Sequence, residues 1–206
     1  MTISGLLEID KRKLDLLWVA LSIGLAVLTW RYALRDGYAP IWLFAALHVQ
    51  CAVLFAIRQP ARFSNKRPLE ILVTLLSLNY FFAFEPVPIA AAPLAPLGAI
   101  VAAAGALLTM VSVHCLGRSF AVFPSLRDIR TSGVYRLVRH PMYFSYMVTA
   151  LGIVLRHATL YNVGVALAGV VLMLWRIRFE ERLLVQDGAY RDYMDTVRYR
   201  LIPGFY

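Results

Sequence analysis

The chain has 206 residues, of which 60% are hydrophobic and only 16% are charged, and its mean hydropathy is +0.66. Soluble domains carry about 25% charged residues, so the composition excludes an ordinary soluble domain and indicates an integral membrane protein. The net charge of +9 does not indicate nucleic-acid binding, because the cations stand between long apolar runs rather than in a basic stripe.

Six apolar segments follow one another along the chain, and we expect them to form an all-α, polytopic membrane helix bundle. They run over about Leu14–Ala33, Ala39–Ile57, Leu69–Phe84, Pro88–Leu116, Met142–Leu155 and Leu160–Trp175. The first continues without a cleavage-site pattern and is predicted to be a retained helix rather than a signal peptide. Prolines in the fourth predict an irregular entry and a helix from about Leu97. The last two are short and predict a tight antiparallel hairpin.

The distribution of cations predicts the orientation of these segments. With six crossings, all but three of the 21 lysines and arginines fall on the side that carries both chain ends; the exceptions are Arg31, Arg35 and Arg156. Cytoplasmic connections are enriched in Lys and Arg, so both termini are predicted to be cytoplasmic. The same side carries the two longest polar stretches, 117–140 and 176–206. We therefore expect a single membrane domain over 1–206, with N-terminal helices in 1–115 and a catalytic core in 116–206.

The sequence contains no pattern that is typical of a metal site or a disulfide framework. Cys51 and Cys115 lie in or at the end of apolar segments, outside any CxxC or Cys/His pattern. The isolated polar residues His48, Asn79 and His114 are more often packing or interhelical hydrogen-bond residues than ligands. No metal is expected.

The motif "RHPMY", residues 139–143, is the first candidate for chemistry. Proline is favoured at the first position of a helix, so Pro141 is predicted to begin the fifth helix with His140 near its N-cap. The start of a helix attracts anions, and Arg139 adds a bidentate donor. These groups could bind a carboxylate or phosphate; alternatively, Arg139 meets lipid headgroups and His140 is an interfacial cap.

The motif "WRIRFEERLL", residues 175–184, is the second candidate. Arg176 and Glu180 are four residues apart on one face of a helix that leaves the sixth apolar segment, while Arg178 and Glu181 lie on another face. Carboxylates at the membrane boundary are costly unless they are paired or functional. The alternative is an ordinary i,i+4 ion pair with solvated neighbours.

Two further stretches complete the polar side. Residues 125–135, "SLRDIRTSGVY", contain turn-forming residues and are predicted to be a loop. Tyr135 and Tyr143 could supply aromatic faces to a heterocycle or cation, or could be belt tyrosines of the membrane interface. The tail from Gly188 to Tyr206 is predicted to contain an amphipathic helix that lies along the membrane surface or caps the site.

These motifs, in this order, resemble the isoprenylcysteine carboxyl methyltransferase family. The resemblance rests on "LGRSF" (116–120), "TSGVYRLVRHPMY" (131–143), "RFEERLL" (178–184) and "YRDYMDTVRYRLIPG" (190–204). It covers residues 116–204, and the wider superfamily includes phospholipid N-methyltransferases and thiol S-methyltransferases. One position departs from the family: RHPxY is often followed by a residue and then glycine, whereas Phe144 is followed here by Ser145.

The resemblance implies S-adenosyl-L-methionine as cofactor and implies a set of residues around it. Those implied to bind the cofactor are Arg127, Asp128, Ile129, Arg130, Tyr135, Arg139, His140, Pro141, Met142, Tyr143, Arg176 and Glu180. Arg176 and Glu180 are also the expected catalytic residues. The simplest division gives Glu180 to the cofactor ammonium and gives Arg176 to the cofactor carboxylate or to the substrate.

The expected function is therefore transfer of a methyl group to a lipophilic or small-molecule acceptor that is reached from the membrane lipids. Carboxylate, phospholipid-amine and thiol acceptors remain open, with an isoprenylcysteine-type carboxylate slightly ahead. A second class is an NADPH-dependent sterol-type reductase, because the cationic motif also suits a 2′-phosphate. A third is a non-enzymatic or transport protein, although the polar residues gather at one face rather than at the midplane.

Overall fold

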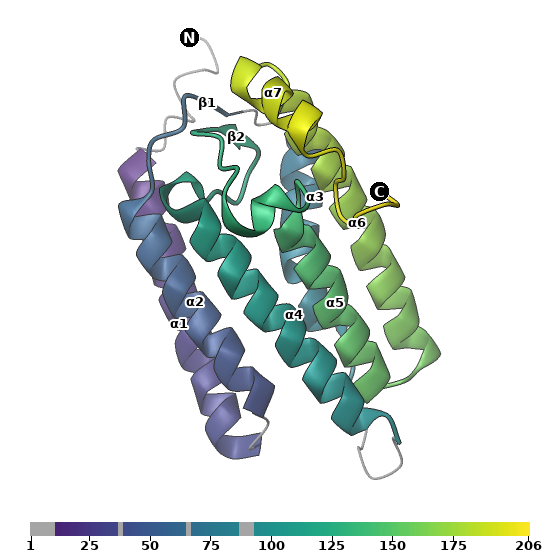
Figure 1. The fold of residues 1–206 in the computed structure, drawn as a ribbon. Helices are drawn as coiled ribbons and strands as arrows, with labels where there is room; N and C mark the ends of the chain where they lie inside the picture. Colours follow the sequence, from purple (N-terminus) through teal and green to yellow (C-terminus); the bar gives the residue numbers. More distant parts are fainter. Residues whose placement is uncertain (1–10, 37–38, 65–66, 87–92) are drawn as a thin grey trace. The chain divides into compact units, whose positions relative to one another are not determined.

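A computed structural model describes residues 11–36, 39–64, 67–86 and 93–206 (Figure 1). Its helices are α1 (Lys11–Asp36), α2 (Ala39–Ile57), α3 (Pro68–Asn79), α4 (Ala95–Leu116), α5 (Pro141–Arg156), α6 (Leu160–Leu184) and α7 (Gly188–Thr196). Two short strands, β1 (Phe63–Ser64) and β2 (Ser125–Leu126), pair antiparallel. Single 3-10 turns cover Tyr80–Ala83, Gly117–Ser119 and Gly133–Arg136.

The mainly helical prediction is confirmed, with two differences. Helix α4 begins at Ala95, two residues before the expected start. Helix α6 continues from the sixth apolar segment through the polar motif to Leu184, in agreement with the helix expected to carry Arg176 and Glu180. The small β1–β2 ribbon was not predicted, because two-residue strands leave no hydrophobic periodicity in the sequence.

By length and composition, two stretches of the described residues are apolar enough to cross a membrane: Ala95–Ser119 and Leu160–Leu184. The apolar helices Ile41–Ile57 and Pro68–Ala83 are too short to count as candidate membrane spans. The six crossings and the cytoplasmic position of both termini therefore stay predictions.

The chain forms two compact units, residues 1–58 and 59–206. The first unit is the α1–α2 helical pair. Trp18 stacks on Phe55 with ring centroids 5.6 Å apart, and Trp30 meets Trp42 edge-on at 4.7 Å. An ion pair links Asp15 of α1 to Arg58, the residue that follows α2.

In the second unit, α4 and α5 approach each other closely because small residues line their interface. Gly98, Ala102 and Gly105 are spaced by about one turn on α4 and contact α5. A Cβ atom on Gly105 would lie 2.6 Å from the backbone nitrogen of Thr149. Small residues allow membrane helices to pack backbone against backbone. The serine at position 145 fits here, because its hydroxyl lies 2.7 Å from that of Thr109.

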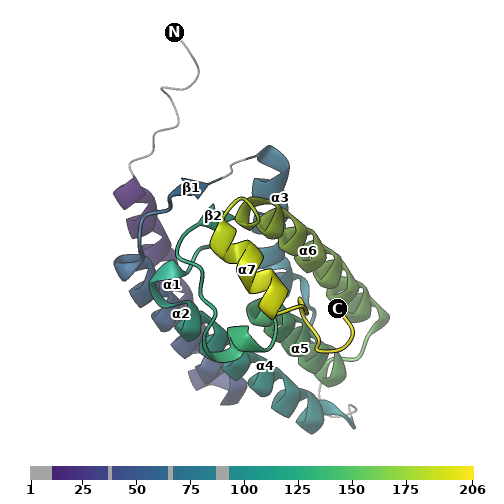
Figure 2. The same cartoon turned by 45° about the horizontal axis from the view of Figure 1, so that its top comes forward.

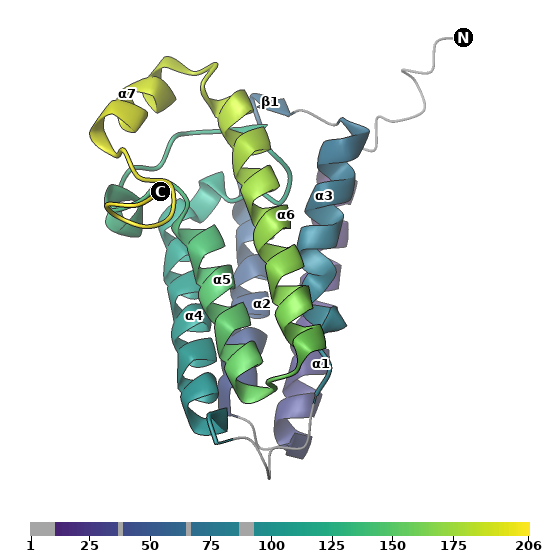
Figure 3. The same cartoon turned by 90° about the vertical axis from the view of Figure 1, so that its right-hand side faces the viewer.

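Helix α6 runs back beside α5 and also packs on α3 (Figure 3). Residues 157–159 connect α5 and α6, which confirms the predicted hairpin. Asn162 fixes this end of the unit: its side-chain amide donates to the carbonyls of Glu85 and His157 and accepts from the Glu85 nitrogen. Gly169 faces the ring of Tyr80, so no larger side chain fits where α6 meets the end of the α3 segment.

The opposite end of this unit, which we call the polar end, is formed by residues 117–140 and 185–206. The β1–β2 ribbon and α7 both lie there, where α5 begins and α6 ends (Figure 2). Tyr190 and Tyr193, one turn apart on α7, are buried, whereas Asp192 and Asp195 are exposed. The predicted amphipathic helix of the tail is thus present, and its apolar side packs against the polar end of this unit.

Candidate active site

Helix α5 begins at Pro141, and His140 occupies the N-cap position, as the RHPMY motif predicts. The C-terminal tail closes over this start. The backbone N–H of Arg139 donates to the carbonyl of Tyr199 at 2.9 Å, and that of His140 donates to the carbonyl of Arg200 at 2.8 Å. These two donors are therefore already used by the tail and are not available to an anion.

Glu181 is the centre of a charge cluster that contains the buried Arg139 and His140 and the partly exposed Arg200. Arg139 contacts its carboxylate through Nε and Nη2, both at 3.0 Å. His140 Nε2 lies 3.2 Å away, and Arg200 Nε donates at 2.7 Å. Arg139 Nη1 also donates to the carbonyls of Val197 and Arg198. The donor fork that the sequence offered to an external anion is thus engaged within the protein.

The sequence did not single out Glu181 as a site residue, and the alternative in which it is a solvated neighbour of an ion pair does not hold. Its side chain is 9% exposed. The only signal in the sequence was its position directly beside Glu180 on a helix that leaves the membrane. Helical spacing puts Glu181 on another face from Glu180, but it does not reveal that the tail and the start of α5 both come to that face.

Tyr143 joins the two residues that were expected to act together on α6. Its hydroxyl donates to Glu180 at 2.6 Å, and its ring lies under the guanidinium of Arg176 at 5.0 Å. Arg176 and Glu180 do not form the ordinary i,i+4 ion pair. Instead, Arg176 is buried and donates to the Ser77 hydroxyl at 3.2 Å and to the Val122 carbonyl at 2.7 Å.

Tyr135 lies in an apolar cluster with Tyr190, Tyr193 and Val197, and the partly buried Ile129 packs against it. The Tyr193 hydroxyl donates to the Tyr135 carbonyl at 2.5 Å. Burial raises the pKa of Tyr135 well above its usual value, and the nearby charge of Glu180 raises it further. Tyr135 therefore stands beside the Tyr143–Glu180 pair as a neutral phenol.

The loop residues from Arg127 to Arg130 have separate surroundings. Arg127 is buried and its Nη1 has no partner. Asp128 is exposed and accepts from Arg62 at 2.7 Å, and that hydrogen bond lowers the pKa of Asp128. Arg130 Nε contacts the Ser119 hydroxyl at 3.2 Å. The structure thus gathers Tyr135, Tyr143, Arg176 and Glu180, with Ile129 at the edge, and leaves Asp128 at the surface.

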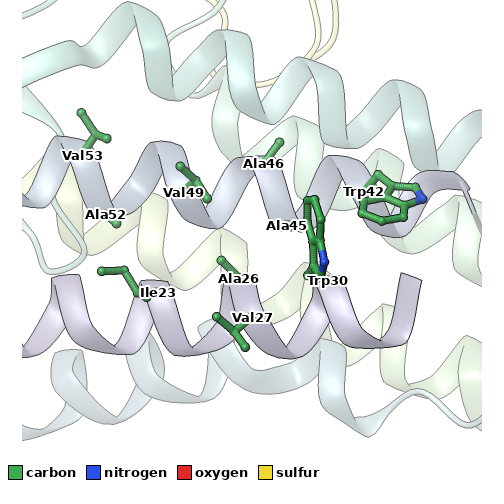
Figure 4. Close-up of a pocket in the computed structure, with 10 residues that line it drawn as sticks. All are labelled: Ile23, Ala26, Val27, Trp30, Trp42, Ala45, Ala46, Val49, Ala52 and Val53. Atoms are coloured by element: carbon green, nitrogen blue, oxygen red, sulfur yellow. The ribbon is translucent and has the colours of Figure 1, made fainter. Parts of the chain in front are cut away.

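Two cavities are found, and neither is lined by these residues. One, of about 600 Å³, is an apolar groove between α1 and α2 that includes Ile23, Val49 and Trp30 (Figure 4). The other, of about 570 Å³, is open and lies beside Cys115 and Gly133. Within the described residues, no group of three or more His, Cys, Asp or Glu side chains could hold a metal ion.

Comparison with known proteins gives two findings. Residues 94–190 match the phospholipid methyltransferase family. The solved structure of a eukaryotic intramembrane Ras methyltransferase, isoprenylcysteine carboxyl methyltransferase, is similar in fold. The two chains are 21% identical with a TM-score of 0.52, and the match covers 90% of this chain and 74% of the other. No curated protein sequence matches.

Proposed function

We propose that this chain is an integral membrane methyltransferase, as the phospholipid methyltransferase match over residues 94–190 and the similar fold support, and that it uses S-adenosylmethionine to methylate a lipophilic or small acceptor reached from the membrane. When bound, this cofactor supplies an electrophilic methyl group on a sulfonium, which an acceptor lone pair takes in line as the sulfonium becomes a thioether. The protein has to bind both partners, orient them and exclude water.

The observation that carries this proposal is the arrangement of Arg176, Tyr143 and Glu180. One cation and one anion, a single helical turn apart on α6, contact the same tyrosine: Arg176 lies over its ring and Glu180 accepts from its hydroxyl. Arg176 is 3% exposed, and its Nε has no partner. This pair fits the two charges that the reaction brings in: Glu180 would bind the ammonium of the cofactor, and the guanidinium of Arg176 would bind a carboxylate, either that of the cofactor or that of the substrate. The stacked rings of His140 and Tyr143, 5.6 Å apart, would form an aromatic wall.

The loop and tail would complete the site. Arg127 has an unpartnered buried nitrogen beside a loop that already contacts Arg176 through Val122. Ile129 and Tyr135 would add apolar surface for a nucleoside. Arg139 would act indirectly, because its contacts with Glu181 and the tail hold the polar end closed over α5. Closure of this kind keeps water from the reacting atoms.

A carboxylate is our first candidate for the acceptor, as in the isoprenylcysteine carboxyl methyltransferase whose fold is similar. It already carries the attacking lone pair, so no residue has to remove a proton, and the product would be an ester. A phospholipid amine, which the family match favours, would have to lose a proton, and a thiol would react as the thiolate.

Calorimetry on the detergent-purified protein tests the cofactor assignment. We expect saturable binding of S-adenosylhomocysteine and none of NADPH. Glu180→Gln and His140→Ala should each weaken that binding at least tenfold, which corresponds to about 1.4 kcal/mol. Asp195→Asn, which changes an exposed carboxylate on α7, is the matched control. Saturable binding of NADPH alone, or unchanged affinity in both site variants, would overturn the assignment.

A further inference from the structure

Helix α3 has an apolar face and a buried polar face. Leu69, Leu72, Leu75 and Leu76 are 42–54% exposed. Glu70, Thr74 and Ser77, which recur at spacings of four and three residues, are at most 5% exposed. Polar residues on membrane helices are directed toward the interior of the bundle and often mark functional sites. The polar face of α3 meets α6 at Arg176.

Arg176 is a buried cation that contacts only neutral groups. Its partners are the Ser77 hydroxyl, the Val122 carbonyl and the Tyr143 ring. Among the described residues, no carboxylate lies within ion-pair distance of its guanidinium. Buried charges are normally paired, because removing a charge from water without a counter-charge is costly. This environment fits a guanidinium that receives an anion from a ligand.

Thr74 supplies a second donor on the same side. It is 1% exposed, and its hydroxyl has no partner. It lies about one turn along α3 from Ser77, which accepts from Arg176 and donates to the Thr74 carbonyl at 2.8 Å. Thr74 on α3 and Arg176 on α6 thus each carry a buried donor without a partner, and Ser77 is hydrogen-bonded to both residues.

The depth of this site favours the membrane acceptor over the cofactor. Arg176 lies eight residues before the end of α6, about 12 Å from the polar end at 1.5 Å per residue. Glu180 is a turn closer to that end. Under the proposed function, the water-soluble cofactor would enter from the polar end, and a lipophilic acceptor would enter from the side on which the leucines of α3 are exposed.

We propose that Thr74 binds the methyl acceptor. Its hydroxyl and Nε of Arg176 donate to one oxyanion of the acceptor, and Ser77 positions the guanidinium. The oxyanion is either the carboxylate that is methylated, whose second oxygen stays free to attack, or a phosphate beside the accepting group. This inference rests on the proposed function and assigns the Arg176 anion to the acceptor rather than to the cofactor.

Removal of the Thr74 hydroxyl tests the proposal that this residue binds the methyl acceptor. Thr74→Val and Ser77→Ala are compared with Thr74→Ser, which retains the hydroxyl, and with Thr149→Val. Thr149 is a matched control because it is also a buried threonine, 2% exposed, but its hydroxyl is already bonded to the Ser145 carbonyl. Labelled methyl transfer is measured to a prenylated N-acetylcysteine and to phospholipid micelles, and S-adenosylhomocysteine binding is measured in parallel.

We expect Thr74→Val to raise the KM for the acceptor about tenfold or more, since a hydrogen bond to a charged group is worth about 1.5–3 kcal/mol. Ser77→Ala should raise KM less. Thr74→Ser should stay within about twofold of wild type, and Thr149→Val should match wild type. The affinity for S-adenosylhomocysteine should not change in any of them. If the valine variant does not fold, Thr74→Ala removes the same hydroxyl.

An unchanged acceptor KM in a folded Thr74 variant would overturn the inference. So would weaker S-adenosylhomocysteine binding with an unchanged acceptor KM, because the anion would then belong to the cofactor. Exclusive methylation of a lipophilic thiol that lacks an oxyanion would also overturn it. Wild-type protein that binds no S-adenosylhomocysteine would instead refute the proposed function, and this is visible before any variant is made.

Discussion

Replacement of either of the two adjacent glutamates on α6 by glutamine removes one negative charge. The two variants should nevertheless differ, because one should lose stability and the other should lose cofactor affinity. Glu181 is surrounded by Arg139, His140 and Arg200, and these contacts attach the tail to the start of α5. Glu180 accepts one hydrogen bond from Tyr143. We therefore expect Glu181→Gln to destabilise the protein and Glu180→Gln to leave it stable but poor in cofactor binding.

The expected loss of stability in Glu181→Gln follows from the burial of the residues that contact Glu181. Arg139 and His140 are 5% and 4% exposed in their side chains, so loss of the Glu181 charge leaves a buried guanidinium without its counter-charge. Breaking a buried pair in this way costs about 3–5 kcal/mol. Arg200 is 37% exposed and adds little because solvent screens its charge. A glutamine oxygen can still accept one hydrogen bond, so we expect about 3 kcal/mol, the lower end.

Thermal unfolding in detergent measures the difference in stability between the Glu181→Gln and Glu180→Gln variants. For a chain of this length about 1 kcal/mol shifts Tm by about 2–4 °C, so Glu181→Gln should lower Tm by roughly 10 °C. Glu180→Gln should stay within about 2 °C, as expected where one hydrogen bond is retained. Hydrogen exchange at residues 197–206 should accelerate in the first variant alone. An unchanged Tm and unchanged exchange for Glu181→Gln would refute the role of the cluster in holding the tail.

Three further perturbations test other parts of the fold. Gly105→Ala should cost about 1–3 kcal/mol in unfolding measurements because its Cβ would meet the α5 backbone, whereas Gly164→Ala, with nothing within 4 Å, should not destabilise. Asn162→Ala should lower stability by about 1–3 kcal/mol, because buried backbone groups lose their partners; a neutral outcome would contradict its role. The Asp128 pKa is lowered mainly by the Arg62 hydrogen bond, so this stabilisation is present above the unfolded-state pKa and is lost as pH falls through the folded pKa. Arg62→Gln should raise the Asp128 pKa by NMR, and an unchanged value would exclude that pairing.

Residues that are close together in the sequence were sufficient to predict the helices and part of the candidate site. Hydrophobic runs of membrane length, with Pro141 at a favoured first position, determine where α5 begins. The spacing of four residues between Arg176 and Glu180 places them on one side of α6, and both reach Tyr143. These features depend only on residues near each other in the chain, which is why periodicity and helix-start preferences predict them.

Partner choice among the charges was decided only by the tertiary structure. Arg139 pairs with Glu181, 42 residues away, and the tail supplies Arg200 and two backbone carbonyls to the same cluster. Helical spacing separates Glu180 from Glu181 but cannot say which face receives the tail. Similarly, Ser77 reaches Arg176, 99 residues away in the sequence, only because α3 packs on α6. A buried charge takes its partner from whatever packing brings within about 3–4 Å, and that proximity joins segments far apart in sequence.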